Sequence, residues 1–224
     1  AESKGQEVVV TRKSDDLPLS CSVLDIEAGE LNKAQENVWQ TDISLGRNHS
    51  WAFSPDAVAR PVNMIVDEIV DRKSKNGVTL LSVAPKADGT LPPSQIDALK
   101  SLGKWMAINK QALHGSKPAP FSDAGIDNWE SGTLRFTTKG DYLYVFELGN
   151  EVLEMEEASD YENSLPPVAP YVIEGLKPLA DSEIIMLGSD KSLPWHLEGD
   201  NLVIERIPEP LPCDYAWTFK IKYR

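Results

Sequence analysis

The sequence predicts a chain in two parts, an α/β portion followed by an all-β portion. In the first part, short runs rich in β-branched residues alternate with segments whose apolar residues recur at helical spacing. The segment Pro118-Ala119-Pro120 interrupts this pattern, and short alternating strands separated by turns continue beyond it. We therefore expect two domains, residues 1–117 and residues 118–224, the second being an antiparallel β-sandwich.

The first part begins with extended runs. Glu7–Thr11 and Ser22–Ile26 are short and rich in β-branched residues, which is typical of strands. Leu31–Asn37 is polar and indicates a loop, and the run Trp39–Ser44 follows it. The α/β portion therefore starts with strands rather than with a helix.

A change of periodicity at Ser54 predicts the first helix. Ser54 can cap this helix, and Pro55 suits its first position. Pro61 lies in the first turns or marks where the regular helix starts. The pair Asn76-Gly77 is a typical C-terminal end of a helix.

A buried strand, a turn and a second helix follow. Val78–Ala84 is almost continuously apolar, which is typical of a strand buried on both faces of a parallel sheet. Asp88-Gly89 predicts a turn, and Pro92-Pro93-Ser94 predicts the start of a helix that ends near Asn109. The expected apolar side of this helix consists of Ile96, Leu99, Leu102, Gly103 and Met106.

Turns and alternating side chains organise the second part. Leu134–Thr137 is expected to pair with Tyr142–Phe146, and Trp195–Leu197 with Leu202–Ile204, each pair forming a hairpin. Glu183–Leu187 is a further strand. The last strand is expected to place five large apolar side chains on one face: Tyr215, Trp217, Phe219, Ile221 and Tyr223.

Composition excludes several classes of function. The net charge of −13 would repel nucleic acid, and no apolar run is long enough to cross a membrane. The two cysteines and three histidines form no metal motif and no disulfide framework, so we expect no metal and no cofactor. The acidic run from Glu151 to Glu162 is interpreted as a solvated loop or edge rather than as a calcium site.

Acidic and aromatic residues in the first part are the candidates for chemistry. Asp25, Glu27 and Glu30 follow the end of a predicted strand, where side chains of an α/β barrel meet the active-site mouth. Trp51 and Phe53 supply apolar faces, as does Trp39. Carboxyl groups beside aromatic rings are what a sugar-cleaving site requires. These residue types alone do not decide between such a site and a loop beside a core.

Several motifs, taken together and in this order, resemble the family 29 glycoside hydrolases, the α-L-fucosidases. The similar segments are Val23–Gly29, Trp39–Gly46, Ser50–Phe53, Lys75–Pro92, Gly103–Asn109, Arg135–Asp141 and Leu187–Ser189. The resemblance implies the last strands and helices of a (β/α)8 barrel, followed by a C-terminal antiparallel β-sandwich. The chain departs from the family at Ala28, where Arg is common, and at Ala52, where Gly is common.

The resemblance also implies roles for individual residues. Glu27 matches the position that many of these enzymes use as general acid/base, with Asp25 and Glu30 as rivals. Trp51 matches the aromatic residue packed against the fucose ring, and Lys13 is a candidate basic residue near the site. The family's Asp nucleophile lies on an earlier barrel strand than this chain contains, so we expect residues 1–224 alone to be inactive.

The implied activity is retaining hydrolysis of terminal α-L-fucosyl linkages in an oligosaccharide or glycoconjugate. The resemblance favours a periplasmic or extracellular location for the full-length enzyme. One alternative is a non-catalytic carbohydrate-binding or scaffold module, in which three residues of the second part (Trp129, Trp195 and Trp217) form a sugar platform. Another is a different retaining hydrolase on the same fold. The oligomeric state and the fucosyl linkage stay open.

Overall fold

A computed structural model describes residues 5, 8–47, 51–55, 58–120, 133–149 and 165–223 of the chain. The acidic run at 151–162 and Trp129 lie outside these described residues. The first strands and helices are β1 (Thr11–Arg12), β2 (Val23–Glu27), β3 (Trp39–Ser44), α1 (Val62–Ser74), β4 (Gly77–Ser82) and α2 (Pro93–Leu113). They are followed by β5 (Lys117–Pro118), β6 (Leu134–Lys139), β7 (Tyr142–Glu147), β8 (Tyr171–Ile173), β9 (Ile184–Met186), β10 (Trp195–Glu198), β11 (Asn201–Ile204) and β12 (Trp217–Lys222).

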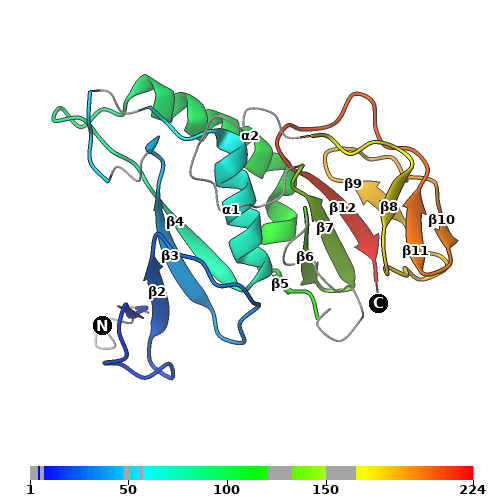
Figure 1. The fold of residues 1–224 in the computed structure, drawn as a ribbon, viewed down its shortest axis with the longest axis horizontal. Coiled ribbons are helices and arrows are strands. Elements are labelled where there is room, and N and C mark those ends of the chain that lie inside the picture. The colour runs from blue at the N-terminus through cyan, green and yellow to red at the C-terminus, as the bar shows by residue number, and fades with distance from the viewer. Residues whose placement is uncertain are drawn as a thin grey trace.

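The elements form three sheets (Figure 1). The strands β1-β2-β3-β4 make a parallel sheet in sequence order. The strands β5-β6-β7-β12-β9 make a five-stranded antiparallel sheet, and β10-β11-β8 make a three-stranded one. The helices α1 and α2 lie between the parallel sheet and the five-stranded sheet (Figure 1). The expected order, α/β followed by all-β, is therefore observed.

Two apolar cores flank the five-stranded sheet because successive side chains of a strand point to opposite faces. On β7, Tyr144 and Phe146 pack against α1 and α2, together with Trp105. The alternate residues Leu143 and Val145 join the core shared with the three-stranded sheet. This sheet is thus covered on both faces.

The parallel sheet is covered on one face only. Gly77 lies on the helix side, where its backbone approaches Trp39 so closely that an added Cβ would come 2.7 Å from the ring. The alternate residues Val78 and Leu80 point the other way and are 48% and 53% exposed. The prediction that Val78–Ala84 is buried on both faces was therefore wrong. An apolar run shows only that a segment is hydrophobic. Burial on both faces also requires a second layer over the sheet, and no described helix or strand covers this face.

The first helix begins at Val62 rather than near Ser54, so Ser54 and Pro55 do not start it. Before Pro61 the chain is extended, because Ala59 bridges Gly46 and the backbone N–H of Arg60 donates to Leu45 O at 2.8 Å. Proline disfavours helical geometry in the residue before it, which keeps Arg60 out of the helix. Of the two anticipated possibilities, Pro61 therefore marks where the regular helix starts.

The end of α1 agrees with the sequence in place but differs in detail. Asn76, not Gly77, adopts the left-handed conformation, with φ of +70°. The Asn76 side chain donates to Gln35 O and Glu36 O, both at 3.1 Å. Asparagine tolerates this backbone region because its short amide bonds locally. Gly77 is instead selected by its contact with Trp39.

The second helix starts as expected, with Pro93 in its first turn, but continues to Leu113. Of the five residues predicted for its apolar side, Leu99, Leu102 and Met106 pack in or against the core, whereas Ile96 and Gly103 are exposed. The buried side includes Ala98, Leu102, Trp105 and Ala112, together with the polar residues Gln95 and Asn109. Gln95 accepts a hydrogen bond from Ala84 N at 3.0 Å, so a polar residue occupies a core position. Apolar spacing alone could not identify this side.

In the second part both predicted hairpins are confirmed, as β6–β7 and β10–β11. The strand predicted at Glu183–Leu187 is β9, and the last strand is β12. Trp217, Phe219 and Ile221 face one core as predicted. Tyr215 was wrongly placed on that face: its φ of +73° turns it away, and it packs against the helix-side core instead.

A buried group of charges connects α1 to the five-stranded sheet. The Asp71 carboxylate accepts from Arg135 Nε at 2.6 Å and from Lys75 Nζ at 2.9 Å, and all three side chains are at most 6% exposed. Asp67, one turn earlier on α1, is buried, and neither of its carboxyl oxygens has a hydrogen-bond partner among the described residues. Burial raises the pKa of Asp67 to about 8, and Glu68, Glu147 and Asp71 add to the increase while Arg135 opposes it.

Candidate functional site

Three charged side chains meet at the edge of the parallel sheet where its strands end. Glu27 is the last residue of β2, and Asp42 lies opposite it on β3. Lys13 directly follows β1. Because neighbouring strands are parallel, their carboxyl ends lie at one edge, where the side chains that follow them converge. The Lys13 ammonium donates to Glu27 Oε2 at 2.9 Å and to Asp42 Oδ2 at 3.4 Å.

Lys13 is held in its charged form by this arrangement. Its hydrogen bond with Glu27 raises the pKa of the ammonium, and the charge of Asp42 adds to the effect. The Glu27 side chain is 60% exposed and that of Asp42 is 21% exposed. Water therefore screens the ion pair, so it contributes little to the stability of the fold.

Asp42 also fixes the turn after β2, a role that the sequence reasoning did not assign. The backbone N–H of Ala28 donates to Asp42 O at 3.0 Å and approaches Asp42 Oδ1 at 3.3 Å. Ala28 is in the left-handed region, with φ of +47°. Asp42 belongs to the motif Trp39–Gly46, so the sequence did contain an indication of its role. Because Asp42 is in register with Glu27, the two side chains lie on the same face of the sheet.

The two rivals of Glu27 occupy different environments. Asp25 lies in the middle of β2 on the same face as Glu27 and is 9% exposed. Its Oδ1 is buried and has no hydrogen-bond partner in the part of the chain that the structure describes. Glu30 is exposed in the loop that follows the strand. Of the three carboxyl groups, Glu27 alone combines a strand end, a facing cation and a neighbouring carboxylate.

The aromatic candidates separate into core and surface. Trp39 is 1% exposed and its indole N–H donates to Lys75 O at 2.9 Å, so it belongs to the core. Trp51 and Phe53 lie in the segment after β3 and are 41% and 39% exposed. Within the described residues, the structure gives Trp51 no hydrogen bond or ion pair with Glu27 or Lys13.

The sugar platform considered for the second part has little support. Trp217 is 4% exposed in the core, and Trp195 packs against the same core with its indole N–H bonded to Ser182 O at 3.0 Å. Trp217 is thus enclosed and Trp195 is only partly exposed, while Trp129 lies outside the described residues.

The sheet edge can perform limited chemistry by itself. Glu27 can exchange a proton with a bound group, and Lys13 can donate hydrogen bonds to hydroxyl oxygens. A glycosidase acid is normally enclosed and works with a second carboxyl group on the other side of the sugar. In the described parts of the chain, no cluster of three or more His, Cys, Asp or Glu side chains is placed to hold a metal ion, and no helix is long and apolar enough to cross a membrane.

Comparisons with known proteins agree on one family. The family model described as α-L-fucosidase matches residues 2–111. The tissue α-L-fucosidase of Homo sapiens is 27% identical over 198 residues, which is 83% of this chain and 37% of the human protein. The α-L-fucosidase of Branchiostoma floridae is 26% identical over 195 residues, 84% of this chain and 39% of that protein. The chain thus spans less than two-fifths of the length of these relatives.

Solved structures show the same relation at the level of the fold. α-L-Fucosidase isoenzyme 1 from Paenibacillus thiaminolyticus superposes with a TM-score of 0.69 at 21% identity, over 90% of this chain and 45% of that one. The α-fucosidase of Thermotoga maritima in complex with a mechanism-based inhibitor also gives 0.69, at 23% identity, over 92% of this chain and 44% of that one. The family match, the aligned relatives and the shared fold all relate this chain to the α-L-fucosidases of glycoside hydrolase family 29.

Proposed function

We propose that residues 1–224 are the C-terminal portion of a retaining α-L-fucosidase that hydrolyses terminal α-L-fucosyl linkages, with Glu27 as its general acid/base. The observation that carries this proposal is the position of Glu27. It ends a strand of the parallel sheet, faces the Lys13 ammonium at 2.9 Å and lies in the segment matched by the family model. A solved relative in complex with fucose supports a fucosylated ligand.

The parallel sheet is, on this proposal, the last part of a (β/α)8 barrel. Its strands β1–β4 are parallel and carry α1 and α2 on one face only. In a closed barrel the opposite face, with Val78 and Leu80, would point into the barrel interior. The antiparallel sheets of residues 118–224 would be the accompanying β-sandwich.

The nucleophile would come from outside this chain. Retaining glycosidases place two carboxyl groups about 5–5.5 Å apart across the sugar, so the second group must face Glu27 over the substrate. The carboxylate in register with Glu27, Asp42, is instead engaged with Lys13 and with the Ala28 backbone beside Glu27. On this proposal Glu27 is the acid/base group with Lys13 and Asp42 beside it, and no carboxylate among the described residues is assigned as the opposing nucleophile.

An activity assay tests the division of roles. We expect residues 1–224 to hydrolyse an aryl α-L-fucoside no faster than buffer; turnover above background would contradict the proposal that the nucleophile lies outside this chain. Reading the coding DNA upstream of the first codon is the companion test, since an open frame that continues into further barrel strands is expected.

The assignment of Glu27 is tested in the protein that joins those strands to this chain. Glu27→Gln should lower kcat by at least about 100-fold, the usual scale for losing an acid/base group. Glu30→Gln is the matched control, because Glu30 is an exposed carboxyl group three residues away, and it should leave kcat unchanged. The opposite ranking of the two variants would transfer the role to Glu30.

A further inference from the structure

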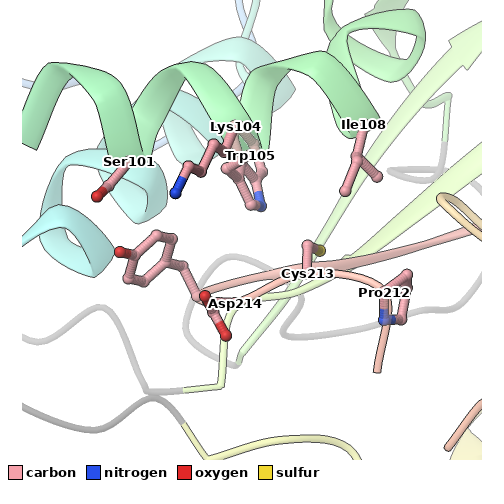
Figure 2. Close-up of a pocket in the computed structure, with 8 residues that line it drawn as sticks. Ser101, Lys104, Trp105, Ile108, Pro212, Cys213 and Asp214 are labelled. Carbon is pink, nitrogen blue, oxygen red and sulfur yellow. The ribbon is translucent and has the colours of Figure 1, made fainter. Parts of the chain in front are cut away.

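A cavity of about 220 Å³ lies between the second half of α2 and the segment that leads into β12. Figure 2 shows Ser101, Lys104, Trp105 and Ile108 projecting from the helix toward Pro212, Cys213 and Asp214 on that segment. The residues that line it include neither Glu27 nor Lys13. The cavity is therefore formed by α2 and the end of the chain, not by the strand ends that carry Glu27.

Four polar groups with different hydrogen-bonding capacity surround this cavity. Ser101 and Lys104 come from α2, and Asp214 and Tyr215 come from the facing segment. The structure gives none of these four side chains a hydrogen bond or ion pair with another described residue. An ammonium, a phenol, a hydroxyl and a carboxylate are thus all available to one ligand.

The floor of the cavity is rigid. Trp105 is 1% exposed and its indole N–H donates to Ala216 O at 2.8 Å. The Cys213 thiol donates to the same carbonyl at 3.4 Å, and Trp217 Nε1 donates to Cys213 O at 2.8 Å. Burial raises the pKa of Cys213 to about 11, so this thiol is a wall of the cavity and not a nucleophile. These hydrogen bonds connect Trp105, Cys213 and Trp217 around the floor of the cavity.

The facing segment is held in a costly backbone conformation. Tyr215 has φ of +73°, which is unfavourable for a bulky side chain. The turn at Gly188 packs against the same segment, since an added Cβ there would come 2.7 Å from Pro212 Cβ and 3.0 Å from Ile108. Strained residues that the surrounding structure fixes in place occur preferentially at binding sites. The left-handed backbone at Tyr215 directs its side chain away from the apolar face that the β12 residues share, and Tyr215 lines the cavity instead.

We propose that this cavity binds one hydroxyl-rich, uncharged ring, such as a single pyranose unit of a saccharide. A polyol can accept from Ser101, Lys104 and Tyr215 while donating to Asp214, so it can use all four polar groups. A phosphate would meet the Asp214 carboxylate and the net charge of −13, and an apolar ligand would leave the polar groups desolvated. The cavity volume is below the roughly 300–1,000 Å³ of sites that bind drug-sized ligands. A volume of this size suits a single ring.

The test is a titration of the full 224-residue chain with methyl glycosides, followed by amide NMR shifts, with inorganic phosphate titrated separately. We expect glycosides, and not phosphate, to shift amides of residues 101–108 and 212–215, with a dissociation constant of roughly a millimolar, the weak end of small-ligand affinity. Lys104→Ala and Asp214→Ala should each weaken binding about tenfold or more, because each removes a charge-assisted hydrogen bond.

Matched variants separate this site from Glu27. Lys100→Ala removes an exposed lysine one turn earlier on α2, and it should leave the titration unchanged. Glu27→Gln should also leave the shifts at 101–108 intact, whatever becomes of the fucosidase assignment. Absence of shifts in the cavity, shifts with phosphate instead of glycoside, or unchanged glycoside binding by both the Lys104 and Asp214 variants would each overturn the proposal.

Discussion

The five-stranded antiparallel sheet and the four-stranded parallel sheet both pack against α1 and α2, but only the first is covered on both faces. On β7, side chains of both faces are buried, Leu143 toward one core and Phe146 toward the other. On β4, Leu81 packs toward the helices while Leu80 is 53% exposed. The same residue type thus contributes differently in two sheets that share a helical layer.

This difference in burial indicates which of the two sheets contributes more to the stability of the chain. Apolar surface stabilises a fold in proportion to the area removed from water, so a one-sided sheet contributes about half of what its composition would allow. Among the described residues, the C-terminal sheets and the two helices form two apolar cores, one on each face of the five-stranded sheet. The parallel sheet depends on the helices alone, although it carries the candidate catalytic residue.

The largest expected effect concerns the charges that join the two regions. Asp71→Asn should destabilise the chain by about 3–5 kcal/mol, because it leaves the buried Arg135 and Lys75 cations without their carboxylate. Urea unfolding measures the change. Asp200→Asn is the control, since it breaks an exposed ion pair with Lys177 and should cost at most about 1 kcal/mol. Equal losses in the two variants would contradict a role for burial.

A matched pair of leucines tests the comparison directly. Leu143→Ala should cost roughly 2–5 kcal/mol, because Leu143 is fully buried and its truncation leaves a cavity. Leu80→Ala should change the free energy of unfolding by no more than about 0.5 kcal/mol, as is usual for an exposed position. A large loss at Leu80 would mean that its face of the parallel sheet is covered in solution, for example by a second copy of the chain.

The buried Asp67 predicts a dependence of stability on pH. Its pKa rises from 3.8 in the unfolded chain to about 8 when folded, so between these values the folded state holds a proton that the unfolded state has lost. Stability from this group is therefore fully present below about pH 4 and declines as the pH rises to about 8, by up to about 1.4 kcal/mol per pH unit.

Asp67→Asn isolates that contribution, because asparagine has nearly the same shape and does not titrate. The stability of the variant relative to the original chain should increase from pH 4 to pH 8, measured by urea unfolding at each pH. A difference that does not vary with pH would show that Asp67 titrates normally in the folded state.

The smallest effect is a difference in local opening. Amide hydrogens of β4, an edge strand with one exposed face, should exchange faster than those of β7, which is paired on both edges and buried on both faces. Hydrogen exchange followed by NMR or mass spectrometry compares them. Equal protection would mean that the parallel sheet is as stable within this chain as the antiparallel sheets.

Local sequence features determined where many of the turns, helices and strands lie. The turn at Asp88-Gly89 forms because Thr90 N–H donates to the Asp88 carboxylate at 2.9 Å and Gly89 adopts φ of +82°. Pro93 lies in the first turn of α2, and both predicted hairpins have their expected partners. These features depend on residues close together in sequence, so the local rules are sufficient.

The tertiary structure alone decided which apolar faces are buried and which charges meet. The exposure of Leu80 depends on what lies over the sheet, and the conversion of Tyr215 from a strand residue into part of a cavity depends on its contacts with α2. Glu27 could be named from the sequence, but its ion pair with Lys13 and its neighbour Asp42 follow from parallel register across three strands. Burial and convergence are properties of segments distant in sequence, which local patterns do not contain.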